Sequence, residues 1–268
     1  MQTSEVTIKG RKIFYRSEGR GPAIVLLHGF GEEGTVWKNQ FDIFRNWQLI
    51  IPDLPGSGRS ESTDDMSIEG MARTVFDFLE AIGIRRCTLI GHSMGGYITL
   101  GFAEKFKDSL NGFGLFHSTA YADSPEKIVA RKKGISFIEQ QGAYEFLKVS
   151  IPNLYSPITK KSNPQIVEEQ INASHNFLAA SLVSYYKAMM ERPDRTKVLI
   201  DSEVPVLFVL GKHDAAVPFK EGLELCHMPR ISYIHILENA GHMGMIEASS
   251  ESNQALLNYI TRIDHQAR

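Results

Sequence analysis

A chain of 268 residues has room for one large α/β domain or two small ones, and length alone does not choose between them. Its 43% hydrophobic and 22% charged residues are typical of a globular protein. The formal net charge of -2 excludes the electrostatic footprint of a nucleic-acid partner or of an anionic membrane partner.

The first residues, the two cysteines and the apolar runs bear on the cellular location of the protein. Cys87 and Cys226 are far apart and lack metal-ligand spacing, so we expect no disulfide. The first residues lead directly into an alternating strand pattern without the charged and apolar regions of a secretory signal. No apolar run approaches membrane-spanning length. These observations predict a cytoplasmic location and no membrane partner.

In chain order, short apolar runs alternate with helical periods. Val6–Ile8 and Ile13–Tyr15, joined through Gly10, predict an opening hairpin. Buried parallel strands read as continuous apolar runs, and such runs stand at Ala23–Leu27, Gln48–Ile51, Thr88–Ile90, Gly112–Phe116, Val206–Leu210 and Ser232–Leu237.

A crossover helix is expected between the second and third of these runs. Ser67 is suited to begin it and Gly83 to end it. Apolar side chains recur there at spacings of three and four residues, at Ile68, Met71, Val75, Leu79 and Ile82. The alternation of strands and helices predicts an open, mostly parallel sheet.

The alternation stops between residues 118 and 192, where helical periods occur without a convincing strand. This segment predicts a helical insertion. It holds more aromatic and thioether side chains than one thin helical layer needs for itself. We expect most of them to pack the insertion onto the main domain and a few to line a cavity over the carboxyl ends of the strands.

The glycine-rich turn Gly91–Gly96 reads G-x-S-x-G, with a strand before it and a helix-like segment after it. Glycines permit a sharp turn around Ser93 and a close approach of the helix to the sheet, which exposes the serine hydroxyl as a nucleophile. A serine hydroxyl needs a base, and the base needs an orienting carboxylate. Asp214 and His242 follow later strands, on the sheet edge where Ser93 is expected. Asp123 is an alternative acid.

These motifs resemble the α/β-hydrolase superfamily over roughly residues 21–260. The matching segments, in order, are "HGFG" from His28, "DLPGSGRS" from Asp53, "GHSMGG" from Gly91, "GKHDAAVP" from Gly211 and "AGHMGMIE" from Ala240. The resemblance implies an eight-stranded, mostly parallel sheet flanked by helices, with a helical cap after the sixth strand. Residues 1–117 and 193–268 would form the core, and residues 118–192 the cap.

The resemblance also implies roles for individual residues. Ser93 would be the nucleophile, His242 the general base and then acid, and Asp214 the residue that orients the imidazole. The backbone N–H groups of Phe30 and Met94 would form the oxyanion hole. Serine at position 93 excludes the mechanism of relatives that use an aspartate nucleophile, such as dehalogenases and epoxide hydrolases.

The stretch "LHGFGEEG", Leu27–Gly34, also contains G-x-G-x-x-G, a dinucleotide-binding spacing, and Asp53 stands where a ribose-binding acid would be expected. Glu32 and Glu33 would repel a pyrophosphate there. We therefore expect this turn to present the Phe30 N–H, and Asp53 to have a structural role. Nine histidines show no compact ligand set, so neither a metal nor a cofactor is predicted.

We expect a serine hydrolase that cleaves a carboxylic ester with a small or medium apolar acyl or aryl group through an acyl-enzyme. The alternatives are a small-molecule receptor that keeps the triad, a carbon–carbon bond hydrolase and a perhydrolase. The sequence does not decide between monomer and homo-oligomer. Candidate pocket residues are Phe30, Trp37, His117, Tyr121, Phe146, Tyr185, Met189, Val217 and Met243.

Overall fold

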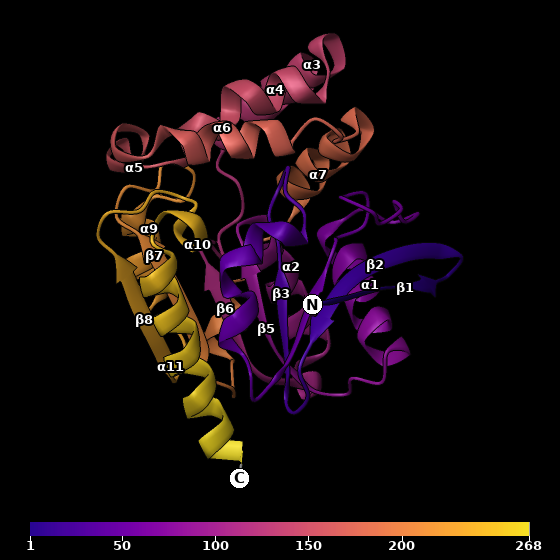
Figure 1. Cartoon of the computed structure of the whole chain (residues 1–268), viewed down its shortest axis with the longest axis vertical. Helices are drawn as coiled ribbons and strands as arrows, with labels where there is room; N and C mark the ends of the chain where they lie inside the picture. Colours follow the sequence, from indigo (N-terminus) through magenta and orange to yellow (C-terminus); the bar gives the residue numbers. More distant parts are fainter. Residues whose placement is uncertain (268) are drawn as a thin grey trace.

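The computed structural model describes residues 1–267, and the side chains of residues 1–264. Eight strands form one sheet in the order β1-β2-β4-β3-β5-β6-β7-β8, which confirms the expected number of strands. The first two pairings, β1 with β2 and β2 with β4, are antiparallel, and the other pairings are parallel. Figure 1 shows the sheet at the centre of the molecule, with helices on both sides.

The six parallel strands lie where continuous apolar runs predicted them. They are β3 (Ala23–Leu27), β4 (Gln48–Pro52), β5 (Cys87–His92), β6 (Leu110–Phe116), β7 (Val206–Gly211) and β8 (Ser232–Leu237). All five residues of β3 are buried, as a strand covered on both faces requires.

The opening hairpin is longer than its apolar residues indicated. It comprises β1 (Gln2–Ile8) and β2 (Arg11–Glu18), and the pairing register continues to Gln2 opposite Ser17. The hydrophobic pattern missed these ends because backbone hydrogen bonds of an antiparallel pair also include exposed polar residues.

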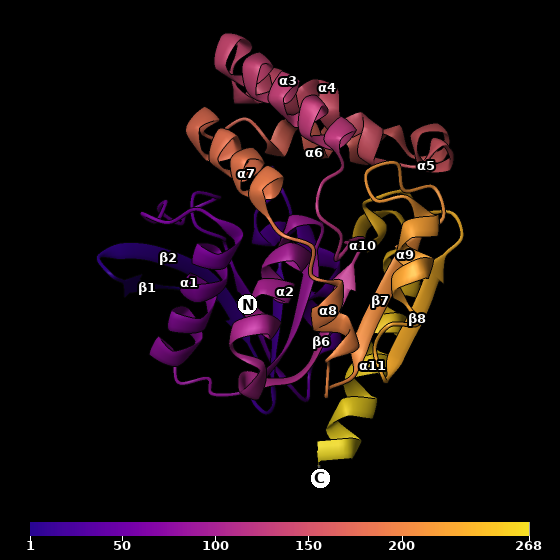
Figure 2. The same ribbon diagram turned by 180° about the vertical axis from the view of Figure 1, so that it is seen from behind.

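Helices cover both faces of the sheet. Figure 2 shows α1 (Ile68–Ala81), α2 (Met94–Lys105) and α8 (Thr196–Ile200) on one face. The other face, in front in Figure 1, carries the 3₁₀ segment η1 (Gly34–Ile43), α10 (Gly244–Glu247) and α11 (Ser249–Ala267). The remaining short elements of the core are η2 (Lys107–Ser109) and α9 (Phe219–Leu225). The Ser67 hydroxyl accepts a hydrogen bond from the Gly70 N–H and begins α1, as predicted.

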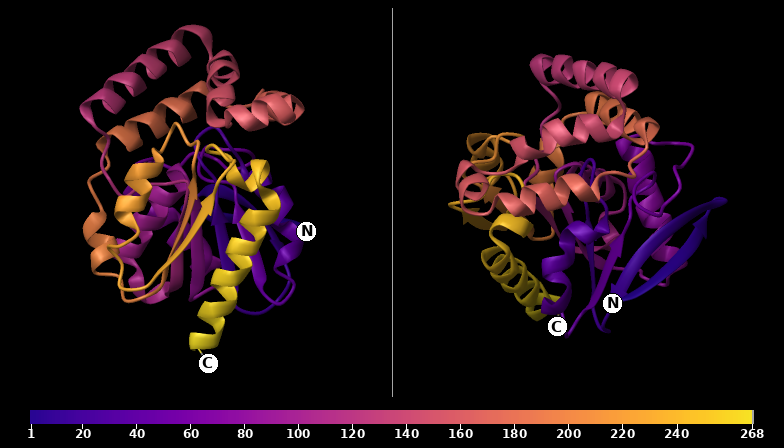
Figure 3. Two further views of the ribbon diagram at one scale, coloured as in Figure 1. Left: turned by 90° about the vertical axis from the view of Figure 1, so that its left-hand side faces the viewer. Right: turned by 45° about the horizontal axis from the view of Figure 1, so that its top comes forward.

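A separate helical layer lies over the end of the sheet at which the parallel strands terminate (Figures 1 and 3). It consists of α3 (Pro125–Gln141), α4 (Ala143–Ser150), η3 (Ile151–Leu154), α5 (Pro157–Ser162), α6 (Pro164–Ala173) and α7 (Ala179–Glu191). Within the described chain, the stretch between β6 and β7 contains helices and no strand. Residues 118 and 192 stay predicted boundaries of a cap.

Both cysteines are free and buried, Cys87 in β5 and Cys226 just after α9. Among the described residues, no helix is long and apolar enough to cross a membrane.

Candidate active site

Ser93 lies in a sharp turn between the end of β5 and the start of α2. Its backbone has φ 51 and ψ -116, a strained conformation for a residue other than glycine. Its N–H donates to the Phe116 carbonyl oxygen in β6 at 3.0 Å. A Cβ on Gly95 would lie 2.6 Å from the His28 carbonyl oxygen, so only glycine lets α2 begin so close to the β3 turn. The expected strand-turn-helix geometry is present.

Asp214 and His242 meet beside this turn, from the loops that follow β7 and β8. His242 Nδ1 is 2.8 Å from Asp214 Oδ2. The other carboxylate oxygen, Oδ1, accepts the N–H groups of Ala216 at 2.8 Å and Val217 at 2.9 Å. Asp214 is therefore fixed from two sides and can hold the His242 imidazole in one orientation.

Charge and burial act in opposite directions on this pair. Burial would raise the pKa of the Asp214 carboxyl, but the His242 and His117 rings outweigh burial and hold that pKa far below its ordinary value. Burial would lower the pKa of His242, but the Asp214 carboxylate outweighs burial and raises that pKa above the ordinary 6.5. An imidazole paired in this way gains proton affinity, which suits a general base.

Ser93 and His242 line the same cavity, of about 150 Å³, under the helical layer. Of the candidate pocket residues, Phe30, Met189 and Val217 also line it. The other residues of its wall are Gly31, Glu32, Tyr97, Arg131, Leu147, Ser150, Ile151, Leu154, Gln170, Tyr186 and Ala216. Its lining is mainly apolar and aromatic, with a few polar groups, as in small-molecule sites.

The two backbone N–H groups predicted to form the oxyanion hole belong to Phe30 and Met94. Met94 is the first residue of α2, so its N–H has no acceptor within the helix. The Phe30 N–H donates no hydrogen bond to any group in the described part of the chain. Gly29 lies beside Ser93, because a Cβ on Gly29 would be 3.1 Å from the Ser93 Cβ. These two donors are available for a developing negative charge.

A buried pair that the sequence analysis did not predict, Glu32 and His92, supports this turn. Glu32 Oε2 accepts the Gly29 N–H at 2.6 Å and lies 2.9 Å from His92 Nδ1. His92 Nε2 is 2.9 Å from the carbonyl oxygen of His242. The pair thus joins the turn after β3, the residue before Ser93 and the loop of His242. The only sequence signal was Glu32 itself, a charged residue between apolar segments.

Four candidate pocket residues do not line this cavity. Trp37 is fully buried, edge-to-face against Phe116 with ring centroids 5.2 Å apart. His117 is buried, and its Nδ1 lies 3.1 Å from Asp214 Oδ2. Met243 is also buried, and the Tyr185 hydroxyl donates to the Pro55 carbonyl oxygen. Each of these side chains is buried and packs or forms a hydrogen bond within the protein.

Two further candidates, Phe146 and Tyr121, do not line the cavity either. Phe146 packs edge-to-face against Phe30 with centroids 6.3 Å apart, and so supports a wall residue from outside. The half-buried Tyr121 accepts a hydrogen bond from Arg192 through its backbone carbonyl. Sequence periodicity could not separate these residues from true wall residues, because it does not give the rotation of each cap helix.

The alternative acid, Asp123, has partners other than the histidine that this hypothesis required. Its carboxylate is bound by Arg131 and Arg192, whereas His242 is bound by Asp214. The structure therefore favours Asp214. Arg131 and Tyr97, which line the cavity, were missed as site residues.

Asp53 has the structural role expected of it. Its Oδ1 accepts from Arg16 at 2.6 Å and from the Gly34 N–H at 2.8 Å, and its Oδ2 accepts from the Arg59 N–H at 3.0 Å. Both carboxylate oxygens are thus engaged within the protein, and neither is free for a ribose.

His117, Asp214 and His242 bring three possible metal-ligand atoms within 4.8 Å of one another. These atoms are already hydrogen-bonded: both histidine Nδ1 atoms face the same Asp214 oxygen. The cluster is explained as one carboxylate that accepts from two imidazoles.

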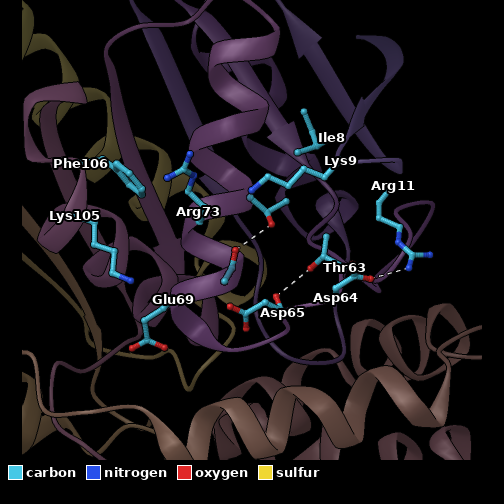
Figure 4. Close-up of a pocket in the computed structure, with 12 residues that line it drawn as sticks. Ile8, Lys9, Arg11, Thr63, Asp64, Asp65, Glu69, Arg73, Lys105 and Phe106 are labelled. Atoms are coloured by element: carbon cyan, nitrogen blue, oxygen red, sulfur yellow. Dashed lines mark hydrogen bonds and ion pairs between the residues drawn. The ribbon is translucent and has the colours of Figure 1, made fainter.

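A larger hollow of about 420 Å³ lies elsewhere on the surface, next to α1 (Figure 4). Ion pairs neutralise several of its charged groups, such as Arg11 with Asp64 at 2.8 Å. Its walls contain none of Ser93, Asp214 or His242. We therefore place the candidate active site in the smaller cavity.

Comparisons with known proteins show the family of this chain. A 2-hydroxy-6-oxo-6-phenylhexa-2,4-dienoate hydrolase of Comamonas testosteroni is 26% identical, over 96% of this chain and 94% of its own. Among solved structures, a thermophilic esterase from Thermogutta terrifontis, with malate bound, is 26% identical with a TM-score of 0.91 and covers 98% of this chain and 99% of its own.

An enol-lactonase from Burkholderia xenovorans has the same fold, with a TM-score of 0.88 at 22% identity over 96% of this chain and 100% of its own. The model of the Alpha/beta hydrolase family matches residues 24–255. That range contains the Ser93 turn and the loops of Asp214 and His242, and the chain therefore belongs to the alpha/beta hydrolase family.

Proposed function

We propose that this protein is a serine esterase that cleaves a small carboxylic ester without a cofactor. One observation carries the proposal: Ser93, in a strained turn, lines the same cavity as His242, whose other ring edge is held by Asp214. This is the arrangement that turns a serine hydroxyl into a nucleophile.

In the proposed acylation step, Ser93 Oγ attacks the ester carbonyl carbon while His242 Nε2 takes the hydroxyl proton. Asp214 stabilises the imidazolium that forms. The carbonyl oxygen becomes an oxyanion, which the N–H groups of Phe30 and Met94 stabilise. The C–O bond of the ester then breaks, and His242 gives its proton to the departing alcohol.

Deacylation repeats the sequence with water. His242 takes a proton from water, the hydroxide attacks the acyl carbon, and Ser93 leaves with the proton that His242 returns. The net reaction converts one ester and one water into one acid and one alcohol. The carboxylic acid then leaves the cavity.

The size and lining of the cavity favour a small acyl group. Its volume of about 150 Å³ lies below the roughly 300–1,000 Å³ typical of drug-sized ligand sites. Much of its wall is aliphatic or aromatic, including Phe30, Leu147 and Met189. The esterase from Thermogutta terrifontis, which matches nearly the whole chain, supports ester cleavage.

Carbon–carbon bond hydrolysis is the second candidate, because the Comamonas testosteroni relative covers 96% of this chain and its name specifies a dienoate substrate. The same serine and histidine would then act on a ketone in place of an ester. The small cavity disfavours a phenyl-substituted dienoate of that kind.

The test is fluorophosphonate labelling followed by esters of increasing acyl length and one dienoate substrate, on wild type and Ser93→Ala. We expect Ser93-dependent labelling and the highest kcat/KM for short acyl esters. A folded wild-type protein that neither labels nor hydrolyses any ester would contradict the proposal. Slow turnover together with ligand-dependent binding of a protein partner would instead support a receptor.

A further inference from the structure

Two side chains that line the cavity have no part in the proposed ester chemistry. Tyr97 is four residues after Ser93, one turn along α2, and Arg131 reaches the cavity from α3. Both belong to a group of charged and aromatic side chains between α2 and the helical layer, which also includes Asp123, Tyr186 and Arg192.

The group carries one positive charge in excess. Asp123, with a fully buried side chain, lies between two guanidinium groups: Arg192, whose side chain is 3% exposed, and Arg131, whose side chain is 18% exposed. One carboxylate cannot neutralise two guanidiniums. Glu32, the acidic residue of the cavity wall, is already bound by the Gly29 N–H and His92.

The two arginines have different roles in this group. Arg192 is occupied, because it donates to Asp123, to the Met189 carbonyl oxygen and to the Tyr121 carbonyl oxygen. Its guanidinium also lies 3.9 Å from the centre of the Tyr97 ring. Arg192 therefore holds Asp123 and Tyr97 in place and has little capacity for a ligand.

Arg131 uses only one edge of its guanidinium. Nε and Nη2 both donate to Asp123. In the described part of the chain, Nη1 has no hydrogen-bond partner and is not among the buried unpaired atoms. A guanidinium fixed along one edge can offer its other edge to a carboxylate in the bidentate manner that arginine favours.

Tyr97 adds a second donor on the same wall. The residue is 5% exposed, and no hydrogen bond to its hydroxyl is found among the described residues. The hydroxyl is also not among the buried polar atoms that lack a partner, so it is open to the cavity. Tyr186 faces Arg131 from α7, with the guanidinium 5.4 Å from the ring centre, and stacks on Phe30 at 4.3 Å.

We propose that Arg131 and Tyr97 form a subsite for a carboxylate of the substrate, so that the ester this protein cleaves is a small one bearing a free acid group. The inference rests on the proposed esterase function and specifies its substrate class. The substrates that fit this subsite have a carboxylate within a few bonds of the ester group, on either its acyl or its alcohol side.

Two matched pairs of esters distinguish these sides, and each pair replaces the carboxylate with a methyl ketone of similar shape. Monomethyl succinate is compared with methyl 4-oxopentanoate, and O-acetyl-lactate with 3-acetoxy-2-butanone. For wild type we expect kcat/KM to favour the carboxylate roughly tenfold or more in at least one pair, as hydrogen bonds to charged groups imply. Equal rates within both pairs would overturn the proposal.

The variants are Arg131→Gln and Tyr97→Phe, with Lys132→Gln as the control. Lys132 is exposed and does not line the cavity, so its variant removes the same charge without touching the wall. Arg131→Gln should remove most of the carboxylate preference, Tyr97→Phe part of it, and Lys132→Gln none. An equal loss in Arg131→Gln and Lys132→Gln would mean that only long-range charge matters, which contradicts a subsite.

A binding measurement separates failure of this inference from failure of the esterase proposal. Succinate is titrated calorimetrically into two proteins, Ser93→Ala and the double variant Ser93→Ala with Arg131→Gln. Fluorophosphonate labelling of the single variant Arg131→Gln checks that its active site is still assembled. Binding that depends on Arg131 supports the subsite even if no ester is hydrolysed. Binding of equal strength to both proteins, or none to Ser93→Ala, would overturn it.

Discussion

Removing the Glu32 carboxylate tests whether the turn after β3 must be held rigidly for activity. Glu32 has a side chain only 3% exposed and binds both the Gly29 N–H and the His92 ring. In Glu32→Ala, both groups lose their acceptor. The His92 ring, which also contacts the His242 carbonyl oxygen through Nε2, would no longer be held by Glu32.

The expected cost follows from these contacts. Leaving a buried hydrogen-bond donor without its acceptor costs about 1–3 kcal/mol, and Glu32→Ala leaves two such donors, the Gly29 N–H and the His92 ring. Glu32→Gln keeps the shape, and its carbonyl oxygen can accept both contacts made by Oε2 but carries no charge, so we expect a loss of about 1 kcal/mol, the difference between a hydrogen bond to a charged acceptor and one to a neutral acceptor. Loss of a fixed Phe30 N–H should lower kcat about 10²-fold or more, the cost of one oxyanion donor.

The assay is denaturant unfolding together with kcat and KM on a short ester, at pH 7. Glu33→Ala is the control, because Glu33 is the neighbouring acid and is partly exposed. Contacts with His92 outweigh burial and lower the pKa of Glu32, so its contribution is fully present above the ordinary value of 4.5 and is lost as pH falls below it. A Glu32→Ala protein as stable and active as Glu33→Ala would refute the reasoning.

Three further results follow from the geometry. Ser93→Gly should abolish labelling and turnover. In thermal unfolding it should be about 1 kcal/mol more stable than Ser93→Ala, because glycine adopts the positive φ without strain. Equal stability of the two variants would argue against backbone strain at Ser93. For the proton transfer, kcat/KM should rise with pH through the pKa of His242, which lies above 6.5. Asp214→Asn should lower kcat about 10⁴-fold and move this limb to lower pH, and an unchanged limb would remove Asp214 as the partner of the imidazole. Gly95→Ala should lose soluble, folded protein on expression, since its Cβ would lie 2.6 Å from the His28 carbonyl oxygen.

The parallel strands and the crossover helix were predictable from the sequence, because burial on both faces leaves a continuous apolar run and a capped helix leaves a 3.6-residue period. Ser93, Asp214 and His242 were predictable for a related reason. Each lies in the turn or loop after an identifiable strand, and the carboxyl ends of parallel strands meet at one edge of the sheet. The ends of the opening hairpin were missed because its exposed polar residues carry no such signal.

The residues of the cavity wall were harder to predict. Met189 lines the cavity, whereas Tyr185, one turn earlier on the same helix, points its hydroxyl to the backbone of Pro55. Trp37 and His117 are aromatic residues near the site that lie behind it. Composition marks such residues as buried, but it does not tell the protein core from a cavity wall.

The sequence by itself determined the sheet, the turn at Ser93 and the loops that carry Asp214 and His242, because these depend on local patterns and on strand ends. Only the tertiary structure decided that Glu32 and His92 brace the turn and that Arg131 enters the cavity with one edge free. Such relations join residues about 40 to 150 positions apart. These contacts depend on how the helical layer packs on the sheet, which no local sequence pattern encodes.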